Sequence, residues 1–283
     1  ILRKQLEGIN SIQVSTTKTA YFSSQNIENG IEAIRNIPME SGFLSGNEYL
    51  YNLLTLGKAF EQSIDGDKKS FTLNYIDWEE IKNNVFHVTE EFPVARSGTT
   101  DSYRPDIVLF VNGIPLCVIE CKRPDIKDSL RQAISQQLRN QKEDGIRSLY
   151  VYSALLLSIA TSSASYATTA TPAKFWSKWR EQFLNKQGED EYKNSLFKLV
   201  NTTCTDKQKE LLFSSRFRYV RHYFEEKEYK TIEPTEQDHY LYSLCRPERL
   251  LELLFSFTVF EDGIKKIARY QQYFAIKKVM ERI

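Results

Sequence analysis

Three residues whose types suit the hydrolysis of a phosphodiester bond lie in one short stretch of the chain. Asp106 follows a proline, and Glu120 and Lys122 come after thirteen intervening residues. Hydrolysis builds negative charge on phosphate oxygens while water attacks, and one or two Mg²⁺ ions can stabilise that charge. Magnesium prefers carboxylate oxygens and water as ligands. We therefore predict Asp106, Glu120 and the backbone carbonyl of Cys121 as metal ligands, with Lys122 placing a positive charge beside the attacking water or the phosphate.

A β-hairpin is predicted to position these residues. Two runs of apolar, largely β-branched residues, 107–111 and 114–119, flank an Asn-Gly dipeptide, which is typical of a tight hairpin turn. Both runs are apolar at almost every position, so both faces should be covered and the pair should lie inside a sheet.

The hairpin also sets a condition on the site. Glu120 and Lys122 are two residues apart on a strand and point the same way. Asp106 joins that face only if the connection has an odd number of residues. We therefore expect a three-residue loop, 111–113, or a β-bulge that compensates for a two-residue turn. The alternative to a metal site is a structural ion pair of Lys122 with Glu120 or Asp106, because a buried carboxylate is costly without a partner.

A helix is predicted to follow, over about 128–142, with Asp128 as its N-cap. Gln136 lies off the apolar side of this helix and is a further candidate catalytic residue. Arg131 and Arg139 could contact phosphates, although such side chains are also common on a solvated helix face.

The other elements are expected from periodicity and composition. Apart from the hairpin and the helix after it, the predictions are a mainly helical segment with loops at 1–66, β-strands at 71–76 and 84–94, a polar loop at 96–103, a buried strand at 149–160, a loop rich in Ser, Thr and Ala at 158–173, and helices from 174 onward.

Composition limits the function only weakly. The 283 residues are 41% hydrophobic and 27% charged with a formal net charge of +1, as in an ordinary globular protein. A local basic stripe could still bind nucleic acid. The four cysteines form no Cys-x-x-Cys pair, which disfavours structural zinc and fits a cytoplasmic protein. We expect no membrane segment and no signal peptide. Because the sequence starts at Ile1, not Met, we expect a piece of a longer protein.

The hairpin residues resemble a known group of nucleases. Asp106 with Glu120-x-Lys122 matches the motif of the PD-(D/E)xK superfamily. The longer string 104–124, with 133–136 behind it, is similar to the N-terminal domain of type I restriction enzyme R subunits (HsdR). Further similarity lies in the stretches 55–58, 84–91 and 170–176.

The resemblance implies a fold, an activity and partners. The implied fold is α/β and restriction-endonuclease-like: a mixed central sheet flanked by helices over 1–185, then a mainly helical linker region, 186–283, leading into a helicase motor. The implied activity is Mg²⁺-dependent cutting of double-stranded DNA without sequence preference of its own, after ATP-driven translocation. The implied partners are methyltransferase (M) and specificity (S) subunits, which would recognise the target.

The C-terminal stretch 268–276 carries a second resemblance, to the segment that leads into the first motor domain. There, a glutamine matching Gln272 belongs to the adenine-reading Q motif of superfamily 2 helicases. No Gly-x-x-x-x-Gly-Lys-Ser/Thr loop occurs in the sequence, so ATP binding is expected only in the full-length subunit.

One position departs from the family pattern. The family often carries Gln-x-x-x-Tyr on the helix after the catalytic strands, and here Gln136 matches the glutamine but Asn140 replaces the tyrosine. Two alternatives remain: a stand-alone repair nuclease of the same superfamily, which Gln272 argues against, and a non-catalytic assembly module, which the intact Asp106, Glu120 and Lys122 argue against.

Overall fold

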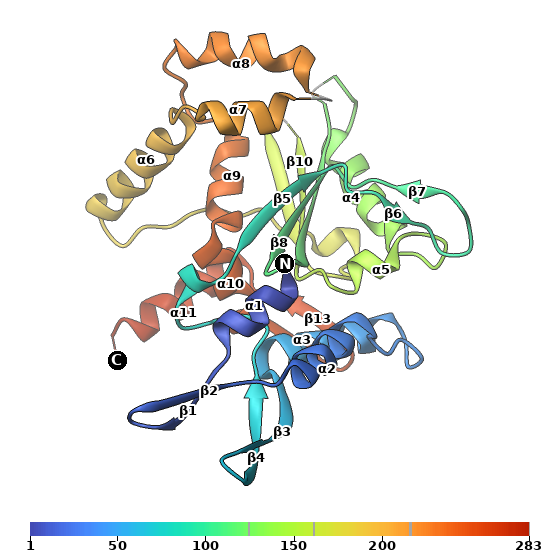
Figure 1. Ribbon diagram of the computed structural model, residues 1–283. Coiled ribbons are helices and arrows are strands. Elements are labelled where there is room, and N and C mark those ends of the chain that lie inside the picture. The colour runs from blue at the N-terminus through green and yellow to red at the C-terminus, as the bar shows by residue number, and fades with distance from the viewer. Residues whose placement is uncertain (124, 161, 215–216, 283) are drawn as a thin grey trace.

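A five-stranded mixed sheet forms the centre of the molecule (Figure 1). The computed structural model describes residues 1–123, 125–160, 162–214 and 217–282. The order across the sheet is β11-β10-β9-β8-β5, with β9 and β10 parallel and the other neighbours antiparallel. The strands are β5 (Phe86–Glu90), β8 (Ile107–Val111), β9 (Ile114–Cys121), β10 (Leu155–Ala160) and β11 (Ser163–Ala167). The predicted mixed central sheet flanked by helices is confirmed.

The predicted hairpin is β8 and β9, and both strands lie inside the sheet as expected. Its turn has two residues, Asn112 with φ 54° and Gly113 with φ 88°, the left-handed pair that a tight hairpin turn needs. The Asn112 side chain is buried and bonds to neighbouring loops, accepting from the Val85 amide and donating to the Tyr75 carbonyl.

The compensating β-bulge that this even turn requires is present. Leu109 pairs with Cys117, but the next residue, Phe110, pairs with Pro115, so β9 contains one extra residue at this point. Proline has no N–H to donate to the ladder and is found at bulges for that reason. Beyond the bulge Ile107 pairs with Ile119, which places Asp106 opposite Glu120 on one face.

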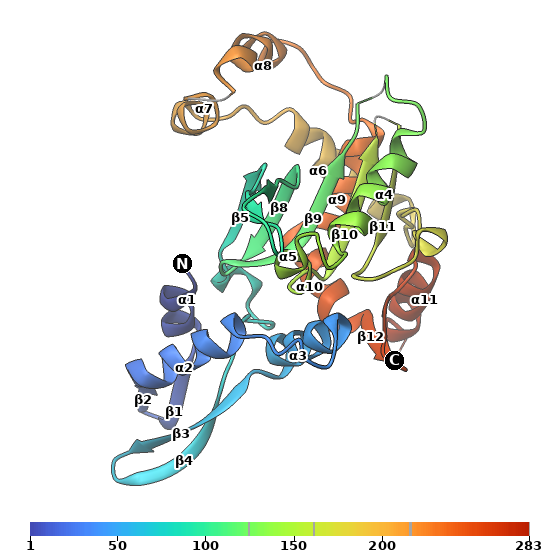
Figure 2. The ribbon, with the colours of Figure 1, turned by 90° about the vertical axis from the view of Figure 1, so that its right-hand side faces the viewer.

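Each face of the sheet is covered by its own helices (Figure 2) and has its own apolar core. Over one face lie α4 (Ser129–Asn140) and α5 (Arg147–Tyr150), where Val108, Val118 and Leu156 form a small core with residues of α5. The opposite face packs into the larger core with α9 (Glu236–Cys245) and α10 (Pro247–Ser256). Helix α4 begins after Asp128, as predicted, but Asp128 makes no side-chain cap bond.

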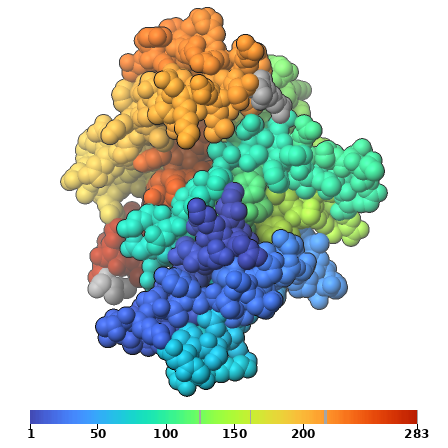
Figure 3. All heavy atoms as spheres, in the orientation of Figure 1, coloured from blue at the N-terminus to red at the C-terminus, as the bar shows by residue number. Residues whose placement is uncertain are grey.

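The N-terminal region is less helical than predicted. Besides its helices it holds two antiparallel hairpins, β1–β2 and β3–β4, the second of which forms one end of the molecule (Figure 3). The elements are α1 (Leu2–Ile9), β1 (Ser11–Ser15), β2 (Lys18–Tyr21), α2 (Ser24–Arg35), α3 (Phe43–Leu56), β3 (Lys58–Ile64) and β4 (Asp67–Leu73). A 3-10 turn, η1 (Ile81–Asn83), precedes β5. A small hairpin follows β5, with β6 (Val94–Ala95) just before the stretch predicted as a polar loop and β7 (Ser102–Tyr103) at the end of that stretch.

Two predictions in the middle of the chain are wrong. The apolar run predicted as one strand at 149–160 is divided into the end of α5 and β10. An apolar run alone does not distinguish a buried helical turn from a strand. The stretch predicted as a loop at 158–173 contains β11, whose small residues are buried beside α9; Thr161, also in that stretch, lies outside the described residues.

The region after 174 is mainly helical, as predicted, but contains one unpredicted hairpin, β12–β13. Its elements are η2 (Ala173–Phe175), α6 (Lys186–Val200), α7 (Asp206–Phe213), η3 (Arg218–Val220), α8 (Arg221–Glu228), α9, α10, β12 (Thr258–Glu261), β13 (Ile264–Ile267) and α11 (Tyr270–Met280). Apolar residues on α9, α10 and α11 belong to the same core as the strands.

Candidate active site

Asp106, Glu120 and Lys122 come together where β8 begins and β9 ends. The Cys121 amide donates to Asp106 Oδ2 over 2.7 Å, which fixes the aspartate against the end of β9. Lys122 Nζ donates to Glu120 Oε1 over 2.6 Å. The three residues predicted from their spacing therefore form one cluster.

Helix α4 adds Gln136 to this cluster. Gln136 Oε1 accepts from Lys122 Nζ over 2.8 Å. The ammonium group is thus held between two acceptors, one on the sheet and one on the helix. Since an ammonium group has three donors, one N–H of Lys122 is left for another acceptor.

Glu120 is the most unusual group of the cluster, because it is fully buried. Burial raises the pKa of its carboxyl to about 7, the nearby Asp106 carboxylate adds to that rise, and the bond from Lys122 opposes it. The ion pair considered as an alternative is therefore formed. It satisfies only one carboxylate oxygen: within the described residues, Glu120 Oε2 is buried and has no hydrogen-bond partner.

This unpartnered oxygen fits a missing cation. A buried carboxylate oxygen without a donor is costly, and a metal ion would remove that cost. Magnesium usually takes one or two carboxylates and fills its shell with water and phosphate, so Glu120 and Asp106 with the Cys121 carbonyl are a sufficient set. In the described ranges no group of three or more His, Cys, Asp or Glu side chains could hold a metal, so these two carboxylates would need non-side-chain oxygens.

A basic hollow opens beside Lys122. Its lining includes Gln136 and the two predicted phosphate-binding residues, Arg131 and Arg139, which are both exposed on α4. Arg139 lies one turn after Gln136, at the three-residue spacing that makes helix residues neighbours, and Arg131 lines the hollow from the N-terminal part of α4. The structure thus brings both arginines to the cluster.

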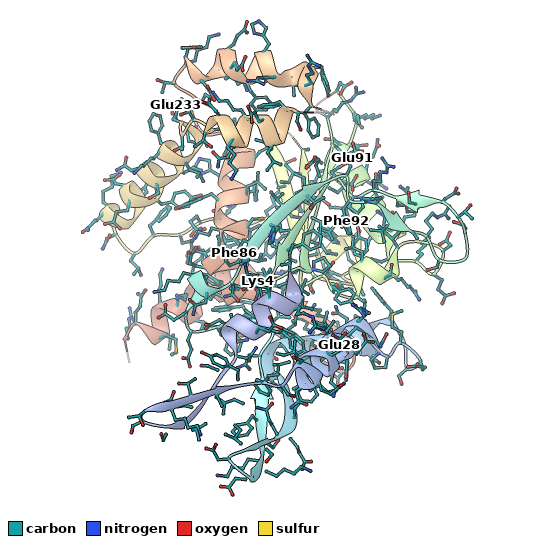
Figure 4. The ribbon with its side chains drawn as sticks, in the orientation of Figure 1. Lys4, Glu28, Phe86, Glu91, Phe92 and Glu233 are labelled. Carbon is teal, nitrogen blue, oxygen red and sulfur yellow. The ribbon has the colours of Figure 1, made fainter. Side chains whose placement is uncertain are left out.

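Two residues near the cluster were not predicted. The amide of Glu91, just beyond β5, donates to the Asp106 carbonyl over 2.8 Å; Figure 4 shows Glu91 beyond the end of β5. Its φ of 42° is left-handed, a conformation that sequence patterns do not reveal. Gln137, buried on α4, donates to the carbonyls of Val118 and Leu157 over 3.2 Å each and so joins β9 to β10.

The position where the family has tyrosine holds Asn140, which is buried and bonds locally through its carbonyl to the Ile146 amide. A different tyrosine, Tyr150 of α5, lies under the helix and donates to Gln137 Oε1 over 2.8 Å. It supports α4 from below and is itself buried, so it does not replace a DNA-contacting tyrosine.

Gln272 lies apart from the cluster, in the first turn of α11. Its Oε1 accepts from the Arg269 amide over 2.8 Å, so the side chain caps the helix start. The predicted adenine contact remains a prediction. Within the described part of the chain, helices long and apolar enough for a bilayer are absent.

Comparison with known proteins agrees with the resemblance to type I restriction enzyme R subunits. Residues 1–177 match the family model described as "Type I restriction enzyme R protein N terminus". Two similar proteins from Methanocaldococcus jannaschii are putative type I restriction enzyme endonuclease subunits: MjaIXP is 27% identical over 82% of this chain and 20% of its own length, and MjaVIIIP is 26% identical over 100% and 22%. The type I restriction enzyme HindI endonuclease subunit of Haemophilus influenzae is 27% identical over 83% of this chain and 19% of its own. The chain spans about a fifth of the length of these relatives.

Proposed function

Because this chain belongs to the family of type I restriction enzyme R protein N-termini, we propose that it supplies the DNA-cutting site of a type I restriction endonuclease subunit. The reaction is Mg²⁺-dependent hydrolysis of DNA phosphodiester bonds at Asp106, Glu120 and Lys122. The observation that carries this proposal is the buried, unpartnered Oε2 of Glu120 beside a second carboxylate and a lysine. In a merely structural ion pair that oxygen would be a cost to the fold, which a bound cation would remove.

The residues of the cluster have separate roles in this reaction. Asp106, anchored by the Cys121 amide, and Glu120 hold the cation, which supplies charge neutralisation at the phosphate and acidifies water. Lys122 is oriented by Glu120 Oε1 and Gln136 Oε1, and its third N–H is free to donate to the attacking water or a phosphate oxygen. This fixed donor stabilises charge that develops during the reaction without reorganisation.

Arg131 and Arg139 hold the DNA backbone beside that lysine. Contacts to phosphates position a duplex but read no sequence. A site made of carboxylates, a lysine and two arginines on one helix face therefore cuts without sequence preference of its own. Target recognition then belongs to partner subunits, the methyltransferase (M) and specificity (S) subunits of the complex.

Cutting follows ATP-driven translocation by a motor that lies outside these residues. Gln272, at the start of α11, contacts adenine there in the full-length subunit, where ATP is the second cofactor. This part of the proposal rests on the resemblance of 268–276 to the segment that leads into a helicase motor. The proposed location is the cytoplasm, which the unpaired cysteines fit.

The test uses the full-length subunit reconstituted with its partner subunits. Lys122→Ala should reduce DNA cleavage at least 100-fold, as removal of one preorganised charge-stabilising donor does, while ATPase in the same tube stays at the wild-type rate. The matched control is Lys4→Ala, on α1 far from the site (Figure 4). Cleavage by Lys122→Ala at the wild-type rate would refute the assignment.

A further inference from the structure

Two buried polar atoms without partners lie next to each other in the sheet. Besides Glu120 Oε2, the hydroxyl of Ser158 is buried and has no hydrogen-bond partner among the described residues. Ser158 on β10 pairs directly with Glu120 on the parallel strand β9. Both residues are 0% exposed.

Their side chains point to the same face of the sheet. Residues paired across two parallel strands project to one side, and neighbouring strands lie about 4.8 Å apart. Gln137 fixes this spacing from above, because its amide donates to one carbonyl on each strand, those of Val118 and Leu157. A serine hydroxyl reaches three staggered positions by rotation about one bond, so it can turn toward the carboxylate without any backbone movement.

Stability gives no reason for a serine at this position. Its neighbours on β10, Leu157 and Ile159, are apolar and buried, as is usual for strands covered on both faces. A buried hydroxyl without a partner destabilises the fold relative to alanine. Alanine at this position would therefore make the fold more stable than serine does. A residue that lowers stability and lies beside the Glu120 carboxylate indicates a role in the site.

We propose that Ser158 is a positioning residue of the nuclease site, an inference that rests on the proposed function. Its hydroxyl donates a hydrogen bond to Oε2 of Glu120, directly or through one water molecule, when that carboxylate is ionised and holds the cation. The bond orients the carboxylate so that its remaining lone pairs face the metal, while Oε1 continues to accept from Lys122. Groups that orient metal-binding carboxylates in this way commonly contribute 10- to 100-fold to metal affinity or activity.

The experiment measures Mn²⁺ binding and thermal stability of the full-length subunit without nucleotide. Mn²⁺ is titrated by electron paramagnetic resonance against wild type, Ser158→Ala, Ser165→Ala and Glu120→Ala, and the sites that remain in Glu120→Ala are subtracted. Ser165 is the matched control, since it is a buried serine that pairs with Ser158 from the far side, on β11. We expect Ser158→Ala to weaken Mn²⁺ binding about 10-fold, with Ser165→Ala unchanged.

Thermal unfolding in EDTA supplies the readout that separates positioning from structure. Because Ser158→Ala removes an unpartnered buried hydroxyl, its unfolding temperature should equal or exceed that of the wild type. Higher stability together with weaker Mn²⁺ binding is not expected of a residue with a purely structural role.

The outcomes separate the two proposals. Wild-type Mn²⁺ affinity in Ser158→Ala, with the site lost in Glu120→Ala, overturns the role of Ser158 alone. An unchanged Glu120→Ala overturns the metal site itself. If Ser158→Ala does not fold, the near-isosteric Ser158→Cys replaces it, because a thiol is a much weaker donor: weaker Mn²⁺ binding supports the proposal and full affinity overturns it.

Discussion

Glu120→Gln should make the metal-free protein more stable at alkaline pH, although it removes a charge from an ion pair. Burial raises the pKa of Glu120 to about 7 from an ordinary value of 4.5. A carboxyl whose pKa is higher in the folded state destabilises the fold when it ionises. Stability is therefore lost as pH rises from about 4.5 to 7, and the loss is complete above pH 7.

The size of the effect follows from the shift. A difference of about 2.5 pH units at about 1.4 kcal/mol each gives roughly 3 kcal/mol at pH 8. Glutamine has nearly the same shape, remains neutral, and its amide oxygen can still accept from Lys122. Glu120→Gln should thus recover up to about 3 kcal/mol at pH 8, or roughly 5–10 °C in unfolding temperature, and almost nothing at pH 4.5.

The assay is thermal unfolding of the 283-residue chain in EDTA at pH 4.5, 6 and 8. Glu40→Gln, at an exposed position, is the control and should show no such trend. Addition of Mn²⁺ should then raise the unfolding temperature of the wild type but not of Glu120→Gln, since a ligand stabilises the state that binds it. A Glu120→Gln variant that is less stable than wild type at pH 8, or equally shifted at all three pH values, would refute the reasoning.

Two further predictions concern other charged residues. Arg131→Ala and Arg139→Ala should each weaken binding of duplex DNA about equally for all sequences and reduce the slope of log affinity against log salt by about 0.9; fluorescence anisotropy in a salt series measures this, and unchanged slopes would contradict a phosphate contact. Lys265, whose ammonium group donates to the Ser153 carbonyl over 3.0 Å, has its pKa lowered by burial to about 7. The buried charge therefore lowers the stability of the fold fully below pH 7, and stability rises as pH increases from 7 toward 10.5. Lys265→Met should stabilise the protein most at pH 6 and least at pH 10. A stabilisation that does not depend on pH would exclude this cause.

The candidate catalytic cluster was predictable because three of its residues lie on or beside one hairpin. Asp106, Glu120 and Lys122 are brought together by local pairing. Periodicity puts Glu120 and Lys122 on one face, and Asp106 joins them only through an odd loop or a bulge. The site of the bulge was the missing piece. Pro115 was its signal, since a proline inside a buried strand cannot complete the ladder, and the Asn-Gly turn then keeps its ordinary two residues.

Residues supplied by distant segments could not be placed in the same way. Ser158 fell where the predicted strand at 149–160 and the predicted loop at 158–173 overlap, because a run rich in serine, threonine and alanine is typical of a loop by composition. Here the small side chains of β11 are buried beside α9, so tertiary packing decides the local structure. Glu91 is in a similar position, since its role depends on a backbone bond to Asp106 rather than on its side-chain type.

Contacts of the C-terminal region connect the start of α11 to the central sheet. Tyr166 of β11 donates to the Ala268 carbonyl over 2.8 Å, immediately before α11. Arg249 of α10, nearly buried, pairs with Glu181 over 2.8 Å and lies over the rings of Trp179 and Tyr273. Strand β11 adjoins β10, and β10 adjoins β9, which carries Glu120. The start of α11 is therefore tied through two strands to the carboxylate that holds the proposed cation, with a single apolar core beneath them. A buried carboxylate oxygen without a partner costs stability, and the apolar burial in this core contributes in the opposite direction.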